Sequence, residues 1–276
     1  MNLARSGWRI RLLAGFTVAC AAAAFILPAI PQPLSYHDFA DCRAMLSIPN
    51  FLNVASNLPF LLAGAYGLAI ALRGHERSFA TGDERLSYLV FFLGAVLTTF
   101  GSMYYHADPD NVRLVWDRLA MTLGLAGLAA AVIAERIDVR VGRKALWPLL
   151  LVGIATVLYW YATEKAGRGN LVPYALYQGW SVLVVAFAAL ALTSRRYTHG
   201  AVLWWVVALY AAAKVAEAFD LAIYRMGEVV SGHSVKHVLA AIAVYAVAEM
   251  LRRRSLVSVA QEASTPGAAR PASETP

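Results

Sequence analysis

Charged side chains are scarce in this sequence. Asp, Glu, Lys and Arg make up 15% of its 276 residues, whereas soluble domains carry about 25%. Hydrophobic residues make up 59% of the chain, and the mean hydropathy is +0.56. This composition argues against a water-soluble globule. Only two cysteines occur, Cys20 in an apolar stretch and Cys42 outside it, so a disulfide framework is not expected.

Long apolar runs, in contrast, recur along the chain. A run of about 20 residues is long enough to cross a bilayer as a helix, whereas membrane β-barrels show short alternating segments. Eight such runs are present, at 12–30, 50–72, 86–106, 112–134, 146–163, 172–192, 201–221 and 233–251. They predict an all-α integral membrane protein, with a seven-transmembrane helix bundle as its core and an additional N-terminal hydrophobic helix.

Lys and Arg are distributed unevenly among the segments that connect these runs. Fifteen of them lie at the two termini and in the second, fourth and sixth connections, against five in the intervening connections. Basic residues concentrate on the cytoplasmic side of membrane proteins. The pattern predicts a multi-pass protein with cytoplasmic N- and C-termini. The basic excess that produces the net charge of +7 then serves to orient the protein in the membrane. No nucleic-acid partner is expected.

Three regions follow from this organisation. Residues 1–35 form an N-terminal cytoplasmic stub and a hydrophobic helix, which fits an uncleaved anchor as well as a secretory signal. Residues 36–251 form the seven-helix membrane domain. Residues 252–276 are rich in Ala, Ser, Thr, Pro and Glu, and this composition predicts a disordered cytoplasmic tail.

Five chemically active residues share one predicted depth in the membrane. Ser102 and His106 end one run, Asp117 lies near the start of the next, and His233 and His237 open the last run. The predicted topology places all five near the outer face. Ionisable residues within membrane spans are rare and usually functional. These residues are therefore candidates for a common site.

The histidine spacing suits a catalytic zinc ion. Residues at positions i and i+4 lie on one face of a helix, so His233 and His237 can bind one metal. His106 completes three ligands and leaves a fourth position open for water, as in catalytic zinc sites. Zinc lowers the pKa of a bound water to about 7. Asp117 can then shuttle a proton, and Ser102 can hold the water or donate a hydrogen bond to the developing oxyanion.

Structural roles for these and neighbouring residues remain open. Asp117 can instead pair with a nearby arginine, and Ser102 can bond back to its own helix. Lys214, Glu217 and Asp220 follow helical spacing, and we expect them to form an ion pair or to support the site rather than to carry protons. The sixth run also contains Tyr174, Tyr177 and Trp180. We expect these aromatic residues to lie in the core or at the membrane interface, and the alternative is that they line a substrate pocket.

A second cation site is a further hypothesis. Asp38, Asp41, Asn50 and Asn53 lie in and just after the first connection. They offer the oxygen ligands that a hard cation such as calcium prefers. Ordinary capping and turn roles in an acidic loop are the alternative.

Several segments resemble one known family. SMYYH at 102–106, WDRLAM at 116–121, HSVKH at 233–237 and IPNFLNVASNL at 48–58 are similar to segments of the alkaline ceramidases. These enzymes belong to a superfamily of seven-helix membrane hydrolases that includes the progestin and adiponectin receptors. The resemblance covers roughly residues 36–251, and it rests on the order of the motifs together rather than on any single one.

The resemblance implies both chemistry and ligands. It implies zinc on His106, His233 and His237, with Ser102 and Asp117 around the water. It also implies hydrolysis of the ceramide amide to a sphingoid base and a fatty acid. Two departures stand out, because Asn50 occupies the place of an expected calcium-ligating Glu, and Val235 and Lys236 replace aromatic residues between the last two histidines.

The sequence thus predicts a zinc-dependent intramembrane lipid amide hydrolase. Its substrate would be a membrane lipid, ceramide or another N-acyl lipid, cleaved to a fatty acid and a free amine. A receptor-like seven-helix protein with a structural zinc site is the leading alternative. A proton or ion transporter is a third class, and the absence of paired interrupted helices argues against it.

Overall fold

The structure is a computed structural model that describes residues 3–74, 78–192 and 196–257. Helices dominate these residues, and the only strand-like pairing in the described ranges is a pair of isolated bridges. The elements are α1 (Leu3–Ile26), η1 (Leu34–His37), α2 (Phe51–Ala55), α3 (Leu58–Arg73), α4 (Gly82–Ala107), α5 (Asn111–Arg136), α6 (Val139–Lys165), α7 (Val172–Ala191), α8 (Val202–Ala218), α9 (Asp220–Arg225) and α10 (Gly232–Arg253).

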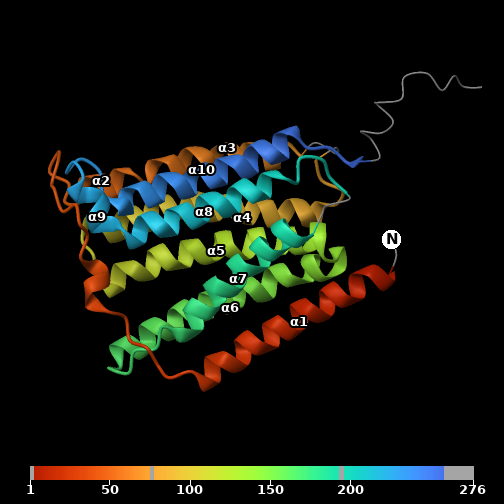
Figure 1. Cartoon of the computed structure of the whole chain (residues 1–276), viewed down its shortest axis with the longest axis horizontal. Coiled ribbons are helices and arrows are strands. Elements are labelled where there is room, and N and C mark those ends of the chain that lie inside the picture. Colours follow the sequence, from red (N-terminus) through yellow and green to blue (C-terminus); the bar gives the residue numbers. More distant parts are fainter. Residues whose placement is uncertain (1–2, 75–77, 193–195, 258–276) are drawn as a thin grey trace, which may run out of the picture.

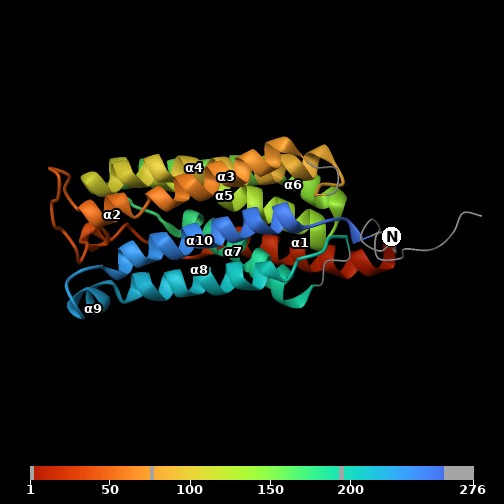
Figure 2. The same cartoon turned by 90° about the horizontal axis from the view of Figure 1, so that it is seen from above.

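Long helices stack side by side along one common direction (Figures 1 and 2). By length and composition, seven helical segments of the described residues can cross a membrane, and the N-terminal one is among them. Helix α8 is shorter, with 17 residues, and it packs against α10. The predicted fold class is confirmed, and the chain is a multi-pass membrane protein.

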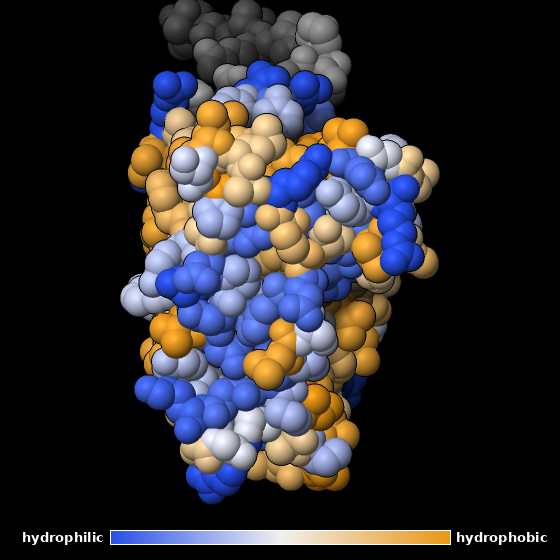
Figure 3. Space-filling model, turned by 90° about the vertical axis from the view of Figure 1, so that its left-hand side faces the viewer, coloured by the Kyte–Doolittle hydropathy of each residue, from blue (hydrophilic) through white to orange (hydrophobic). Residues whose placement is uncertain are grey.

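Large hydrophobic side chains are exposed on the sides of the bundle. Leu62, Leu151 and Trp205 are 72%, 69% and 68% exposed, whereas a soluble protein would bury most such residues. The end of the bundle differs, because hydrophilic residues cover its middle and hydrophobic ones lie along its edges (Figure 3). This distribution is the one expected where lipid contacts the sides and water contacts the ends.

Local sequence explains where the helices begin at this polar end. The side chain of Asp110 accepts a hydrogen bond from the backbone N–H of Arg113 at the start of α5, and Ser231 accepts one from Ser234 N–H at the start of α10. Such N-caps satisfy backbone donors that have no partner within the helix. The caps fix the two helix starts close to the C-terminal end of α4.

The run expected at 50–72 is a single span that is interrupted. Helix α2 ends at Ala55, and α3 begins at Leu58 with Pro59 in its first turn. A proline removes one backbone donor and its ring clashes with the carbonyl four residues earlier, so a continuous helix is disfavoured here. The interruption places Ser56 and Asn57 at the polar end of the bundle.

Glycines allow α4 and α5 to approach closely. A Cβ atom on Gly101 would lie 2.6 Å from the carbonyl oxygen of Trp116, and one on Gly127 would lie 2.5 Å from the backbone nitrogen of Phe91. Small residues at such contacts are typical of membrane helix packing. Residues next to Gly101 on α4 are thereby held against the start of α5.

Both described termini lie at the end of the bundle away from α2 and α9 (Figure 1). Many of the basic residues counted above gather there and bond to protein groups. Arg9 donates to the carbonyl oxygen of Arg136 at 2.7 Å, and the buried Arg254 pairs with Glu135. The alternating helix directions therefore bring the basic connections to one end, as the sequence pattern requires.

The two flanking regions are partly described. Helix α1 contacts α7, and Trp180 Nε1 donates to Thr17 Oγ1 at 3.1 Å. At the other terminus α10 continues to Arg253, and the backbone N–H of Val257 bonds to the carbonyl oxygen of Arg196. The rest of the predicted tail, 258–276, lies outside the described residues.

Candidate metal centre

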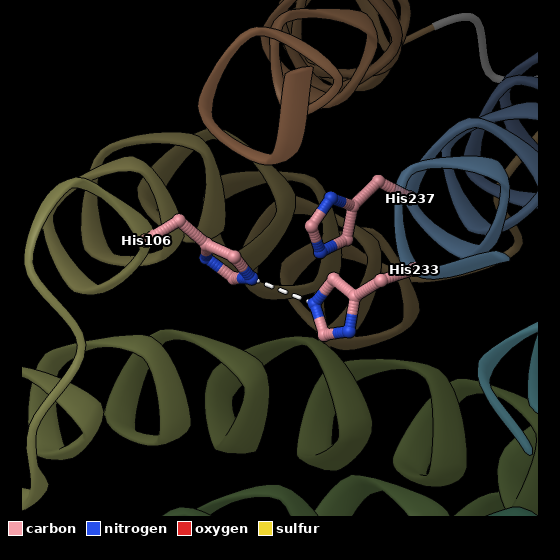
Figure 4. Close-up of side chains that lie close together, drawn as sticks. All are labelled: His106, His233 and His237. Atoms are coloured by element: carbon pink, nitrogen blue, oxygen red, sulfur yellow. Dashed lines mark hydrogen bonds between the residues drawn. The ribbon is translucent and has the colours of Figure 1, made fainter. Parts of the chain in front are cut away.

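Three histidines from two helices meet at the polar end of the bundle. His106 lies at the C-terminal end of α4, and His233 and His237 lie in the first two turns of α10. They are 1%, 6% and 4% exposed. One ring nitrogen of each lies within 4.8 Å of the others, which makes them the only group of three or more His, Cys, Asp or Glu ligand atoms of this kind in the described residues. Figure 4 shows the three rings turned toward one another.

Hydrogen bonds orient two of the rings, and for His106 the bond also fixes which nitrogen is protonated. The Nδ1 atom of His106 lies 2.6 Å from the carbonyl oxygen of Ser102, so this nitrogen carries the proton and Nε2 carries the lone pair. The Nδ1 atom of His237 lies 2.8 Å from the hydroxyl of Ser56. A metal-bound histidine commonly donates its other ring N–H in this way.

The donor set fits a metal ion. The Nε2 atoms of His106 and His233 face each other at 2.7 Å, and the Nζ atom of Lys236 lies 3.1 Å from His233 Nε2. A nitrogen that accepts from an ammonium is itself unprotonated. Two facing lone pairs in a buried site are stabilised by a cation beside them. Three imidazoles are the ligands that zinc and similar transition metals prefer.

Aromatic packing closes one side of the histidine cluster. Phe39, which precedes α2, stacks on His106 with ring centroids 4.9 Å apart and lies 4.7 Å from His233. The Phe39 side chain is 7% exposed. The loop before α2 thus covers the two facing rings with an apolar group and excludes water from that side.

Ser102 and Asp117 lie in the wall of a cavity of about 360 Å³ that also contains His237. Ser102 is one helical turn before His106, and its Oγ lies 3.3 Å from His106 Nδ1. The close contact at Gly101 brings this turn against Asp117 on α5. The structure therefore brings together all five residues that the sequence placed at one depth.

Neither Arg113 nor Arg118 forms an ion pair with Asp117 among the described contacts. Arg113 pairs with Asp108 at 2.8 Å and with Asp110 at 2.5 Å. Arg118 donates to the side-chain oxygen of Gln32 at 2.6 Å. The Asp117 carboxylate, which is 8% exposed, remains directed to the cavity.

Apolar side chains form most of the cavity wall. Phe60, Phe91, Leu128 and Val244 are among them, and each belongs to or packs against the main hydrophobic core. Tyr174 also lines the cavity. Tyr177 and Trp180 instead bond to Thr122 and Thr17. A mainly apolar cavity with a few polar groups is typical of sites for small molecules and lipids.

The acidic residues of α8 and α9 hold the start of α10. Asp220 accepts a hydrogen bond from the backbone N–H of His233 at 2.7 Å and a second from Ala40 N–H at 3.0 Å. Glu217 pairs with Lys236 at 2.9 Å and also with Lys214. These contacts match the expected ion pair and support of the site. They also tie the loop before α2 to the histidine helix.

The four residues considered for calcium lie around the same loop. Both carboxylate oxygens of Asp41 bond to Arg43 at 2.8 Å, and this guanidinium holds the pKa of Asp41 below its ordinary value. Asn53 donates to the backbone oxygen of Asp41, Asn50 donates to that of His106, and Asp38 is exposed. Calcium would have to replace Arg43 on Asp41, so its binding stays a prediction.

The sequence analysis did not identify three residues that support the site. Ser56 contacts His237, Phe39 packs on the rings, and Arg118 lines the cavity. The periodicity of the sequence does not identify any of the three. Phe39 and Ser56 reach the site from segments that are remote in sequence from the histidines, and helical periodicity alone does not show that Arg118 faces the cavity. Ser56 lies within the segment 48–58 that carries part of the family resemblance, and Phe39 precedes that segment.

The sequence from residue 40 to residue 265 matches the Ceramidase family. This range includes all five clustered residues and covers most of the chain, so the chain belongs to this family. Membership implies an amidohydrolase with a lipid substrate such as ceramide. A search of the curated proteins found no match.

Proposed function

Because the chain belongs to the Ceramidase family, we propose that it is a zinc-dependent intramembrane lipid amide hydrolase. It would cleave an N-acyl lipid of the ceramide type to a fatty acid and a free amine. The observation that carries this proposal is the meeting of three buried imidazoles with Ser102 and Asp117 beside a largely apolar cavity. The catalytic domain would be residues 36–251.

His106, His233 and His237 would hold the zinc. When bound there, zinc would supply a Lewis acid and make a water available as a nucleophile at neutral pH. The remaining chemistry belongs to residues of the cavity wall.

Asp117 would move the proton. Hydrolysis requires water to attack the amide carbon, a proton to leave that water, and a proton to reach the amide nitrogen as the carbon–nitrogen bond breaks. One carboxylate can accept the first proton and return it to the leaving amine. The burial of Asp117 keeps bulk water from exchanging with it during this transfer.

Ser102 would donate a hydrogen bond to the carbonyl oxygen as it gains negative charge. Donors directed at a developing oxyanion contribute strongly to catalysis in buried sites. The apolar side chains of the cavity would hold the acyl chain, whose transfer from lipid to such a wall exposes no apolar surface to water. A substrate could therefore react without leaving the membrane.

The membrane orientation is part of the proposal. Basic connections lie at the end opposite the histidines, and basic residues concentrate on the cytoplasmic side. We therefore place both termini in the cytoplasm and the site near the outer face.

The test uses the full chain purified in mild detergent. We expect one zinc per chain by elemental analysis, release of fatty acid from N-acyl lipids, and loss of this release on chelation. Asp117→Asn should lower kcat by about 10²- to 10⁴-fold, the usual contribution of a general acid–base, with zinc content unchanged. Asp108→Asn is the matched control, because this exposed carboxylate bonds to Arg113 outside the cavity.

Each outcome separates the candidate functions. Zinc without hydrolysis of any N-acyl lipid would favour the receptor-like alternative. Folded protein that binds no metal would refute the proposed site. Full activity in Asp117→Asn would refute the proton transfer assigned to this residue.

A further inference from the structure

The apolar cavity beside the histidines has a defined depth. On each of three helices it is lined by a polar residue near the histidines and by an apolar residue toward the opposite end of the bundle. These pairs are Ser102 and Phe91 on α4, Asp117 and Leu128 on α5, and Glu217 and Val206 on α8. The two members of every pair are eleven positions apart. Since a helix rises about 1.5 Å per residue, all three helices give a depth of about 16 Å.

Fully buried side chains close the deep end of this cavity. They lie one helical turn beyond the deepest lining residues of α4, α5 and α8, and they are Tyr88, Val132 and Leu203. All three belong to the main hydrophobic core, and none of the three lines the cavity. Protein cores are packed as densely as organic crystals. A hydrocarbon chain that reaches this layer therefore has to stop or turn aside.

The cavity has room for one hydrocarbon chain, and the acyl chain fits its position. The volume of about 360 Å³ is at the low end of the range for small-molecule sites. An acyl chain begins at the carbonyl carbon, so it is the half that can run directly from Ser102 and Asp117 to the deep end. The amine half of a ceramide carries hydroxyl groups, which need partners when buried. The deep wall at Ala95, Leu125 and Val244 offers no polar side chain.

We propose that the cavity limits the acyl chain of the substrate to about 12 to 14 carbons. An extended peptide spans about 3.3–3.6 Å for every three backbone bonds, or about 1.2 Å per bond, so a depth of about 16 Å takes roughly 13 bonds. This inference rests on the proposed amide hydrolysis and names its substrate class: N-acyl lipids with an acyl chain of medium length. A longer chain has to bend or to displace core side chains.

The first test measures kcat/KM of the wild-type protein in detergent for N-acyl sphingosines that differ only in the acyl chain. The saturated chains have eight, twelve, fourteen, eighteen and twenty-four carbons. We expect the highest value at twelve or fourteen carbons. At eighteen carbons the value should fall by about five- to a hundredfold, because overfilling a packed site is as costly as overpacking a core. A value that stays level or rises from fourteen to twenty-four carbons overturns the proposal.

A second substrate series assigns the limit to the acyl half. It uses sphingoid bases of different chain length, all carrying the same twelve-carbon acyl group. We expect no comparable fall in kcat/KM along this series, because the chain of the amine stays outside the cavity. A limit that follows the amine chain instead of the acyl chain would overturn the assignment.

Two variants should move the limit in opposite directions. Ala95 lines the cavity seven positions before Ser102. Ala95→Leu therefore places a larger side chain about 10 Å from the catalytic residues, and it should shorten the preferred chain to about eight or nine carbons. Leu128→Ala opens space at the deep end, which its neighbours fill only in part, and it should lengthen the preferred chain by about two carbons.

Leu89→Ala is the matched control. Leu89 packs against the same hydrophobic core as Leu128 but does not line the cavity, so its variant should keep the wild-type preference. Ala95→Leu removes no packing, and it tests the proposal even where Leu128→Ala does not fold. A folded Ala95→Leu protein that keeps the wild-type preference, or that loses activity equally at every chain length, would refute the limit.

A binding measurement separates this inference from the proposed function. On protein stripped of metal, we expect saturated fatty acids of the same five lengths to raise Tm, with the largest increase at twelve or fourteen carbons. If no amide is hydrolysed but this maximum is present, the proposed function fails and the length limit stands. If hydrolysis occurs without any length preference in rate or in Tm, the proposed function stands and the length limit is refuted.

Discussion

Removal of the Ser56 hydroxyl is a direct test of how the histidines are held. Ser56 lies in the interruption between α2 and α3, and its Oγ lies 3.2 Å from the backbone oxygen of Asn53 and 2.8 Å from His237 Nδ1. A hydroxyl has one proton. We expect the hydroxyl to donate it to Asn53 and to accept from His237 Nδ1–H, which leaves the lone pair of His237 on Nε2.

The magnitude follows from this arrangement. In Ser56→Ala the buried Nδ1–H of His237 has no acceptor, which costs about 1–3 kcal/mol. The ring can relieve the cost by moving its proton to Nε2, but that tautomer cannot bind a metal through Nε2. Either way the metal-binding form is disfavoured by roughly 1.4 kcal/mol or more, so the zinc dissociation constant should rise about tenfold.

The assay is a zinc competition titration against a chelator of known affinity, with protein in detergent. Ser181→Ala is the matched control. Ser181 is a buried membrane serine whose hydroxyl bonds to the backbone oxygen of Tyr177 within its own helix, at 2.9 Å. The control should lose no zinc affinity, and its Tm should show the cost of removing a buried hydroxyl alone.

Two results would refute the reasoning. Unchanged zinc affinity in Ser56→Ala would show that the hydroxyl does not select the tautomer. An equal loss in Ser56→Ala and Ser181→Ala would show a general loosening of the bundle rather than an effect on His237.

Two further predictions concern packing and pH. Gly101→Ala should lower the free energy of unfolding by about 1–3 kcal/mol, because its Cβ would meet the Trp116 carbonyl oxygen, whereas Gly179→Ala, which has open space, should be neutral or stabilising in thermal unfolding. Asp41→Asn should lower Tm at pH 7. Because Arg43 depresses the folded-state pKa of Asp41, its contribution is full above about pH 4 and is lost as pH falls through that pKa, so a Tm difference that stays constant down to pH 3 would contradict this account.

The fold class and the histidine cluster could both be predicted from the sequence, because they depend on the length of the apolar runs and on the helical spacing of residues within them. Apolar run lengths located the membrane helices, and alternating helix direction then determined which run ends meet. The spacing of His233 and His237 put both on one helix face, and the direction of α4 brought His106 to the same end. The structure shows these three together with Ser102 and Asp117 beside one cavity.

The remaining contacts could not be predicted from the sequence, because contacts between segments that are far apart along the chain leave no periodic pattern in it. Ser56 reaches His237 only because Pro59 interrupts a span that looks continuous by hydropathy. Asp220 bonds to Ala40 across 180 positions.

The loop before α2 determines from which side a substrate can approach the histidines. Phe39 stacks on His106 and packs against His233, and the next backbone N–H bonds to Asp220. Arg43 joins Asp41 to the carbonyl oxygen of Val229. The loop is thus fastened to the start of α10 by side chains that also position His233. The loop side of the cluster is closed, and the opposite side opens on the apolar cavity. We therefore expect a lipid amide that enters that cavity from the bilayer to meet Asp117 and the histidines together, with its acyl chain still in an apolar environment.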